Sequence, residues 1–221
     1  MSVVGVAEAA AELGVSDRRV RQMLADGVLA GDRVGRAWVI DPEQLRRMEH
    51  RRPEVGRPWS PASAWAVLAL ADGEDPDLSP VERSRARKRL AQGLDGIAGR
   101  LSARAELRHF YAHPSVLDRL AEAPAVVRGG ISAAAEHGAD LVAADGFEGY
   151  LRPGELDKLV AKFGLDDEAG RPNVALRVVD DAVWPFRPGQ VAAGRAVVAV
   201  DLLESDDPRS RRAGMDLMVD R

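Results

Sequence analysis

The placement of capping residues and glycines in the first forty residues constrains the fold of this chain more than any other feature. Apolar residues recur at helical spacing over residues 6–13, and Gly14 follows at a position typical of a helix C-terminus. Ser16 is a good N-cap for a second helix over residues 17–25. The segment is therefore predicted to form two short helices joined by a tight turn.

A hairpin and a third helix are predicted next. Residues 34–40 have the pattern of two short strands around Gly35, with Trp38 and Ile40 on one strand face. Asp41 can cap a further helix whose first position is a proline. The order helix, turn, helix, hairpin, helix is that of a winged helix-turn-helix.

The second helix is expected to present polar side chains opposite its core face. At about 100° per residue, Val20, Met23 and Leu24 define the core side. Arginine can hold guanine with two hydrogen bonds, glutamine can do so with adenine, and a helix N-terminus can bind phosphate. The alternative is an ordinary solvated basic face. The candidate DNA-binding residues are Ser16, Arg18, Arg19, Arg21, Gln22, Arg33 and Arg36.

Residues 6–45 resemble the helix-turn-helix of the MerR and excisionase families. The matching pieces run over residues 9–16, Val20, residues 26–29 and residues 33–40. The resemblance implies that Arg18, Arg19, Arg21 and Gln22 lie in the major groove. It also implies that Arg33 and Arg36 lie on the wing.

Composition narrows the function classes. The chain has no cysteine, which excludes disulfides, cysteine-ligated zinc, iron–sulfur clusters and thiol nucleophiles. The longest apolar run, Ala64–Ala71, is far shorter than the roughly 18 residues that span a bilayer, so we expect a cytoplasmic protein without membrane contact. Residues 1–110 have net charge +2 and residues 111–221 net charge −6. If nucleic acid is bound, it is therefore expected at the front half.

The chain is predicted to contain two domains. Residues 1–52 form the winged helix-turn-helix, and residues 53–59 form a Pro/Gly/charged linker. The remaining domain, residues 60–221, is predicted to be helical over 60–105 and mixed over 106–221. The whole chain is expected to be α+β, with an N-terminal winged helix-turn-helix and a mixed α/β C-terminal domain.

The pattern of the second domain predicts alternating strands and helices. An apolar helix over 60–71, a polar loop over 72–78 and a very basic helix over 81–90 come first. The basic helix is interpreted either as an accessory phosphate contact, as a contact for the acidic half, or as a solvated face. Strands are then expected at 107–112, 126–128, 150–152 and 173–179, and helices at 115–121, 132–137, 155–163 and after Pro208.

Two acidic segments invite a catalytic or metal-binding interpretation. Asp201, Glu204, Asp206 and Asp207 could hold Mg²⁺, and His137 could act as a base oriented by Asp140. Helix capping explains these residues better. Asp206 or Asp207 can cap the last helix, and Glu136 and His137 end a short helix before Gly138. We therefore expect no catalytic residues, no metal and no cofactor.

Residues 59–213 resemble the C-terminal region of AbiEi-type antitoxins of type IV toxin–antitoxin pairs. The resemblance is carried by residues 113–117, 129–141, 173–179, 200–204 and 207–211. It implies a repressor of its own operon that counteracts a neighbouring nucleotidyltransferase-type toxin. The expected partners are double-stranded DNA of its own promoter and a cognate toxin, contacted directly or indirectly.

Two other functions remain open from the sequence. The second domain could bind a small molecule that controls DNA affinity, or the chain could be an enzyme, which is not expected because no nucleotide-binding loop is recognisable. Regulators with this motif commonly bind palindromic operators as dimers. No heptad pattern fixes the oligomeric state, so a homodimer is one option.

Overall fold

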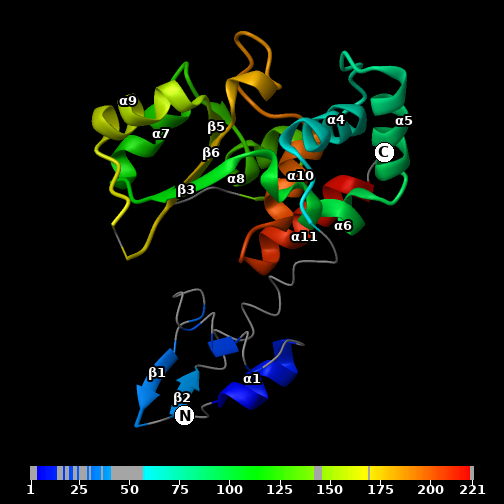
Figure 1. Cartoon of the computed structure of the whole chain (residues 1–221). Helices are drawn as coiled ribbons and strands as arrows, with labels where there is room; N and C mark the ends of the chain where they lie inside the picture. Colours follow the sequence, from blue (N-terminus) through cyan, green and yellow to red (C-terminus); the bar gives the residue numbers. More distant parts are fainter. Residues whose placement is uncertain are drawn as a thin grey trace. The chain divides into compact units, whose positions relative to one another are not determined.

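The structure of the protein is a computed structural model (Figure 1). It describes residues 4–13, 17, 20, 21, 24, 29, 31–35, 37–40, 57–141, 146–168 and 170–219, without the side chains of residues 11–13, 32, 34, 37 and 219. The chain divides into two compact units, Met1–Glu54 and Val55–Arg221, here named the front unit and the second unit.

The front unit combines helix α1 (Val6–Leu13) with two antiparallel strands, β1 (Gly31–Val34) and β2 (Ala37–Ile40). The predicted first helix and the predicted hairpin around Gly35 are thereby confirmed. Val4 adds a bridge to Ile40 that the sequence did not suggest. Its N–H and carbonyl bond the backbone of Ile40 at 3.0 and 2.9 Å. The predicted third helix from Asp41 lies outside the described residues.

The second unit alternates helices with short strands, as predicted. Its α-helices are α4 (Pro61–Ala71), α5 (Pro80–Leu90), α6 (Leu94–Ile97), α7 (Leu117–Ala121), α8 (Gly130–Ala133), α9 (Pro153–Phe163), α10 (Arg195–Leu203) and α11 (Pro208–Val219). Its strands are β3 (Glu106–Phe110), β4 (Val127–Arg128), β5 (Phe147–Leu151) and β6 (Val174–Val178). Short 3-10 turns are η1 (Ala98–Arg104), η2 (Pro114–Val116), η3 (Ala134–His137) and η4 (Asp181–Val183).

The four strands form one mixed sheet in the order β3-β6-β5-β4. β3 runs antiparallel to β6, β6 runs parallel to β5, and β5 runs antiparallel to β4. The sequence predicted the strands but not this order, because neighbours in the sheet are distant in the chain. The parallel pair β5 and β6 is joined through α9.

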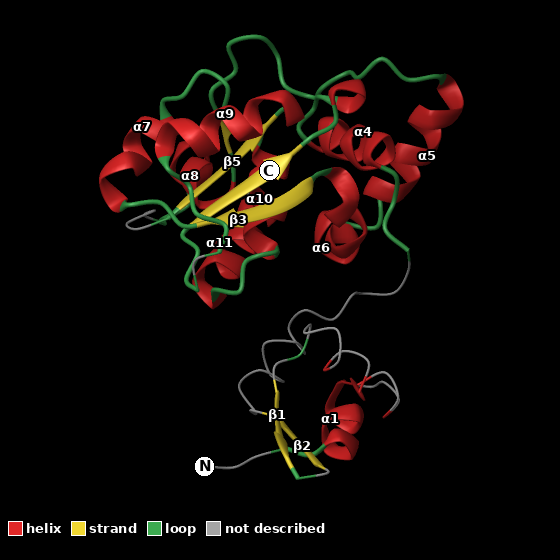
Figure 2. Ribbon diagram, turned by 60° about the vertical axis from the view of Figure 1, so that its left-hand side comes forward, coloured by secondary structure: helices red, strands yellow, loops and turns green. Residues whose placement is uncertain are grey.

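Side chains from the sheet supply two separate cores. Phe147 and Leu151 of β5 pack with α7 and α9, whereas Tyr150 packs with α4, α8 and α10. This alternation follows from the two-residue period of a strand. Helices therefore cover the sheet on both faces (Figure 2), and polar side chains of β5 and β6 on the α10 face become buried.

One predicted helix has different bounds, and one segment without a prediction proves to be helical. The helix expected over 132–137 begins earlier and is split into α8 and the 3-10 turn η3, because the N–H of Gly130 bonds the Asp201 carboxylate and starts the turn there. The apolar run 196–202 proves to be a helix, α10, which is buried around nearly its whole circumference. An apolar helix of this kind belongs in a core.

Within the described part of the chain, no helix has the length and hydropathy needed to cross a bilayer.

Candidate nucleic-acid interface

The front unit holds its second helix through a small apolar core. Residues 17, 20, 21 and 24 are helical, and Val20 and Leu24 are buried. This confirms the core face that the wheel predicted for those two residues. The core is completed by residues from α1 and the hairpin, and its buried members are Val4, Ala9, Ala10, Val20, Leu24, Leu29 and Ile40.

Arg21 projects from that helix into solvent. Its side chain is 59% exposed and its guanidinium lies 3.5 Å from the carboxylate of Asp17, one helical turn earlier. An exposed pair of this kind contributes about 0–1 kcal/mol and is screened by salt. The contact therefore leaves Arg21 able to exchange Asp17 for a phosphate or a base edge.

The hairpin presents a second arginine. Arg33 on β1 is exposed and lies opposite the half-buried Trp38 of β2. Gly35 forms the turn with φ of 64°, the left-handed region that favours glycine. Gly31 packs closely, since a Cβ there would lie 2.8 Å from Leu24 Cδ2 and 3.0 Å from the carbonyl of Val39. A small residue at position 31 thus lets the hairpin approach the helix.

The remaining predicted DNA-binding residues are not placed. Ser16, Arg18, Arg19, Gln22 and Arg36 lie outside the described residues. Their role in base or phosphate contact stays a prediction. Arg21 and Arg33 are thus the two members of the predicted set that the structure places, and both are exposed.

The arginines of the basic helix α5 differ in their contacts. Its capping box joins Ser79 and Glu82, and the two hydrogen bonds from Ser79 lower the pKa of that glutamate. Arg83 pairs with Asp75, and Arg89 stacks 4.5 Å above the ring of Trp59. Three further cations on this helix are exposed, which leaves a contact with phosphate as one interpretation: Arg85, Arg87 and Lys88.

The most unexpected group of charges lies inside the second unit. We name it the buried ionic cluster, and it consists of Arg104, Glu148, Tyr150, Arg177, Asp201 and Glu204. Sequence reasoning considered Asp201 and Glu204 as metal ligands and did not identify their arginine partners. Arg104 lies 97 residues from Asp201 in the sequence, so no local signal marks that pairing.

Arg104 is the centre of the cluster. Its side chain is 1% exposed, and its guanidinium donates to Asp201 at 2.6 Å and to Glu204 at 2.6 and 2.7 Å. Its backbone carbonyl accepts from the indole N–H of Trp65. Asp201 also accepts from the hydroxyl of Tyr150 and the N–H of Gly130. Because buried ions are costly unless paired, this geometry fixes α10 against η1 and β5.

Arg177 completes the cluster from β6. It donates to Glu148 at 2.8 Å and lies 3.3 Å from Asp201 and 3.4 Å from Glu204. Burial raises the pKa of Glu148, which Arg177 offsets only in part. Burial would also raise the pKa of Glu204, but the two arginines outweigh that effect and lower it. Each of the three carboxylates is thus already paired with at least one arginine of the same chain.

The other acidic candidates have structural contacts as well. Asp207 accepts from the N–H and hydroxyl of Ser210, both at 2.9 Å, which confirms the predicted cap of α11. His137 Nε2 lies 2.9 Å from the carbonyl of Ala193, and Glu136 pairs with Arg128 at 2.7 Å. Across the described residues, no cluster of three or more His, Asp or Glu side chains could hold a metal ion.

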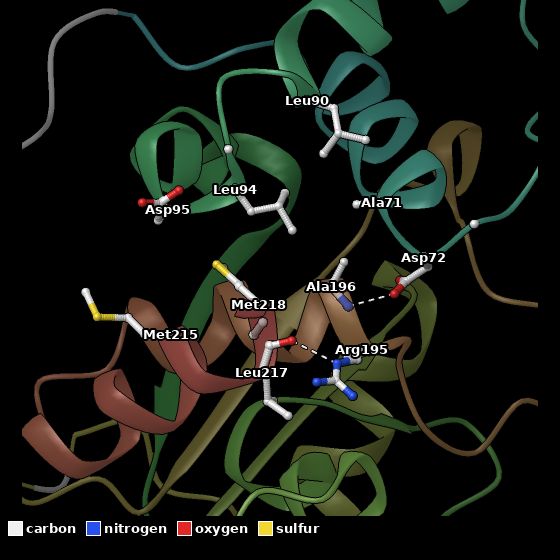
Figure 3. A pocket seen from close by; sticks show the side chains of 13 residues that line it. Ala71, Asp72, Leu90, Leu94, Asp95, Arg195, Ala196, Met215, Leu217 and Met218 are labelled. Carbon is white, nitrogen blue, oxygen red and sulfur yellow. Dashed lines mark hydrogen bonds between the residues drawn. The ribbon is translucent and has the colours of Figure 1, made fainter. Parts of the chain in front are cut away.

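A pocket of about 720 Å³ opens between four segments of the second unit. Figure 3 shows Leu90 and Leu94 on one side, Met215 and Met218 on another, and Asp72 at the end. Asp72 accepts from the N–H of Ala196 at 2.6 Å, and Arg195 Nε donates to the carbonyl of Leu217 at 2.8 Å. The volume is in the range of small-molecule sites, which are mostly apolar with a few polar groups.

Residues 3–52 match the family described as a helix-turn-helix domain. No curated protein and no solved structure matches the chain. The protein is therefore a mixed α+β chain with an N-terminal helix-turn-helix domain, which indicates DNA binding and transcription regulation. The resemblance of residues 59–213 to AbiEi-type antitoxins stays a prediction.

Proposed function

We propose that the protein is a sequence-specific DNA-binding antitoxin that represses its own toxin–antitoxin operon and counteracts a nucleotidyltransferase-type toxin. The observation that carries the DNA-binding part is the exposure of Arg21 and Arg33 on a helix-turn-helix scaffold with its own core. The antitoxin part rests on the resemblance of residues 59–213. In this proposal the β1–β2 hairpin serves as the wing.

The proposed docking follows from the chemistry of the front unit. The second helix would enter the major groove, where arginine and glutamine read base edges, and the hairpin would lie along a groove or the phosphates. Arg21 would leave Asp17 for DNA, at a cost of about 0–1 kcal/mol. The second unit would act as a binding module rather than an enzyme, since Asp201 and Glu204 are bound by arginines.

Gel shift at low salt on the DNA just upstream of the gene tests the DNA-binding part. The full chain should retard this DNA and leave a scrambled duplex of equal length unshifted. Arg18→Ala or Arg36→Ala should weaken the specific shift, because each removes a predicted contact. Arg171→Ala is a matched control, since it removes the same charge from an exposed loop of the second unit. Absence of any shift would overturn the proposal.

Co-expression with the product of the adjacent gene tests the antitoxin part. The chain should restore growth that the neighbouring protein inhibits. The double variant Arg18→Ala/Arg36→Ala should still restore growth when expressed from an unrelated promoter, because toxin neutralisation would use the second unit. If growth is not restored while the gel shift persists, the protein is a DNA-binding regulator without antitoxin function.

The pocket beside α10 and α11 favours a second candidate, a ligand-responsive regulator. Its leucine and methionine lining suits an apolar small molecule, because methionine adapts its shape to a ligand. A bound ligand raises apparent stability, by about 2.7 kcal/mol at a hundred times its Kd. Thermal-shift screening should then find compounds that also change DNA affinity. Met215→Trp, which fills the pocket from an exposed position, should abolish both effects.

A further inference from the structure

The two edges of the sheet in the second unit are finished differently. At the β4 edge, Arg128 donates its N–H to the carbonyl of Val191 at 2.9 Å and accepts from the N–H of Ala193 at 2.8 Å. This segment closes the edge as an added strand would. At the β3 edge, a bridge of this kind lies at Tyr111, beyond the end of the strand, where the N–H and carbonyl bond Asp166.

The backbone N–H and carbonyl of Leu107 point away from β6, toward the outer edge of the sheet. Val179 donates its N–H to Leu151, so the odd-numbered residues of β6 direct their backbone groups toward β5. Leu107 lies opposite Arg177, one of these odd residues, and therefore forms a non-hydrogen-bonded pair with it. Tyr111 is odd-numbered like Leu107, and its backbone bonds Asp166 on the outer side of β3, which agrees with this alternation. The N–H and carbonyl of Leu107 thus form part of an open edge.

The residues on either side of Leu107 carry opposite charges, so this segment is complementary to an antiparallel copy of itself. Leu107 is 43% exposed, and it lies between Glu106 and Arg108, whose side chains are 69% and 41% exposed. Arg108 lies 3.6 Å from Glu106 and 3.8 Å from Asp167 in the same chain, near the limit for an ion pair. These weak contacts can be exchanged for stronger ones.

We propose that β3 pairs antiparallel with β3 of a second copy of this chain, with the two-fold axis at Leu107. The two Leu107 residues then exchange N–H and carbonyl hydrogen bonds and pack their side chains together. Glu106 of each copy lies opposite Arg108 of the other, which gives two cross-strand ion pairs. The result is one continuous eight-stranded sheet through an interface of the isologous kind.

Other registers are disfavoured by charge. An axis at Arg108 would place the two arginines opposite each other, and like charges directly opposite are destabilising. An axis at His109 would place Arg108 opposite Phe110, with no partner for either ion. The sequence Glu-Leu-Arg therefore selects the register at Leu107.

The proposed dimer goes beyond DNA binding and can be tested without DNA. Sedimentation of the full chain over a range of concentrations should show a monomer–dimer equilibrium. Glu106→Arg and Arg108→Glu should each raise the dimer Kd about tenfold, since each converts both cross-strand ion pairs into like-charge pairs. Glu155→Arg is a matched control, because it reverses one charge of the exposed pair with Lys158 on α9.

A mixture of the two single variants gives the decisive measurement. In a heterodimer of Glu106→Arg with Arg108→Glu, every arginine lies opposite a glutamate, so dimers should return although each variant alone dissociates. Leu107→Pro should also give monomers with an unchanged circular dichroism spectrum, because its lost N–H points out of the sheet. A monomeric wild-type chain, or a mixture that stays monomeric, would overturn the proposal.

Discussion

The front unit and the second unit use arginine in opposite ways. In the front unit, Arg21 and Arg33 are exposed, and the carboxylate of Asp17 near Arg21 belongs to a solvated pair. In the second unit, Arg104 and Arg177 are 1% and 5% exposed and satisfy several carboxylates at once. The same side chain is accessible to a ligand where it is solvated and serves a structural role where water is excluded.

This difference predicts where a substitution affects stability and where it affects binding. Removing one partner of a buried ion pair leaves an uncompensated charge and costs about 3–5 kcal/mol, whereas an exposed pair contributes about 0–1 kcal/mol. Removal of a fully buried arginine from the buried ionic cluster should therefore destabilise the second unit. Changes to exposed arginines of the front unit should alter DNA affinity at unchanged stability.

The largest effect is expected for Arg104→Leu. This variant leaves Asp201 buried beside Tyr150 without its closest cation, and we expect a loss of about 3–5 kcal/mol in the free energy of unfolding. Urea unfolding followed by circular dichroism measures the loss. Arg152→Leu is the control, because it removes an exposed arginine that pairs with Asp181. Equal losses in the two variants would contradict the distinction between buried and exposed arginines.

Gly31→Ala tests whether the front unit can be destabilised without affecting the second unit. The added Cβ would lie 2.8 Å from Leu24 and 3.0 Å from the carbonyl of Val39, so the hairpin must shift away from the helix, at a cost of about 1–3 kcal/mol. DNA affinity should fall while the unfolding transition of the second unit stays in place. Gly5→Ala, where nothing lies within 4 Å of the new Cβ, should leave both unchanged.

Arg21→Ala and Arg33→Ala test whether the exposed arginines of the front unit contact a base edge or a phosphate. A residue that contacts a base edge should lose about 1–3 kcal/mol of binding and relax specificity at one position. A residue that contacts phosphate should instead reduce the salt slope of the binding constant by about 0.9. Fluorescence anisotropy at several salt concentrations separates the two. A lowered melting temperature in either variant would show a structural role instead.

The smallest effect on stability is expected when the two partly exposed glutamates of the cluster, Glu148 and Glu204, are replaced. Burial raises the pKa of Glu148 above 4.5, so its contribution to stability is present below that pH and is lost as pH rises through the folded-state pKa. The arginines lower the pKa of Glu204 below 4.5, so its contribution is present above that pH and is lost as pH falls through the folded-state pKa.

Glu148→Gln should therefore gain stability relative to wild type as pH rises above 4.5. Glu204→Gln should lose stability relative to wild type as pH rises toward 4.5 from below. Urea unfolding from acid to neutral pH measures both differences. The same sign of pH dependence in the two variants would contradict the opposite shifts in pKa.

Local signals predicted most of the secondary structure. The helices expected over 81–90 and 155–163 appear as α5 and α9. Ser79 and Glu82 cap the first and Gly164 with φ of 62° ends the second, and such caps depend only on residues within one turn. The same reasoning located the hairpin around Gly35. Val20 and Leu24 were placed in the core of the front unit from helical periodicity alone.

The sequence by itself determined the order of helices and strands, their caps and the basic character of the front unit, since each depends on neighbours a few residues apart. Only the tertiary structure decided the strand order and the partners of Asp201. Arg104 and Asp201 are 97 residues apart, and no local pattern encodes a contact at that separation. Their pairing exists because the folded sheet and α10 exclude water around both charges, which makes each require the other.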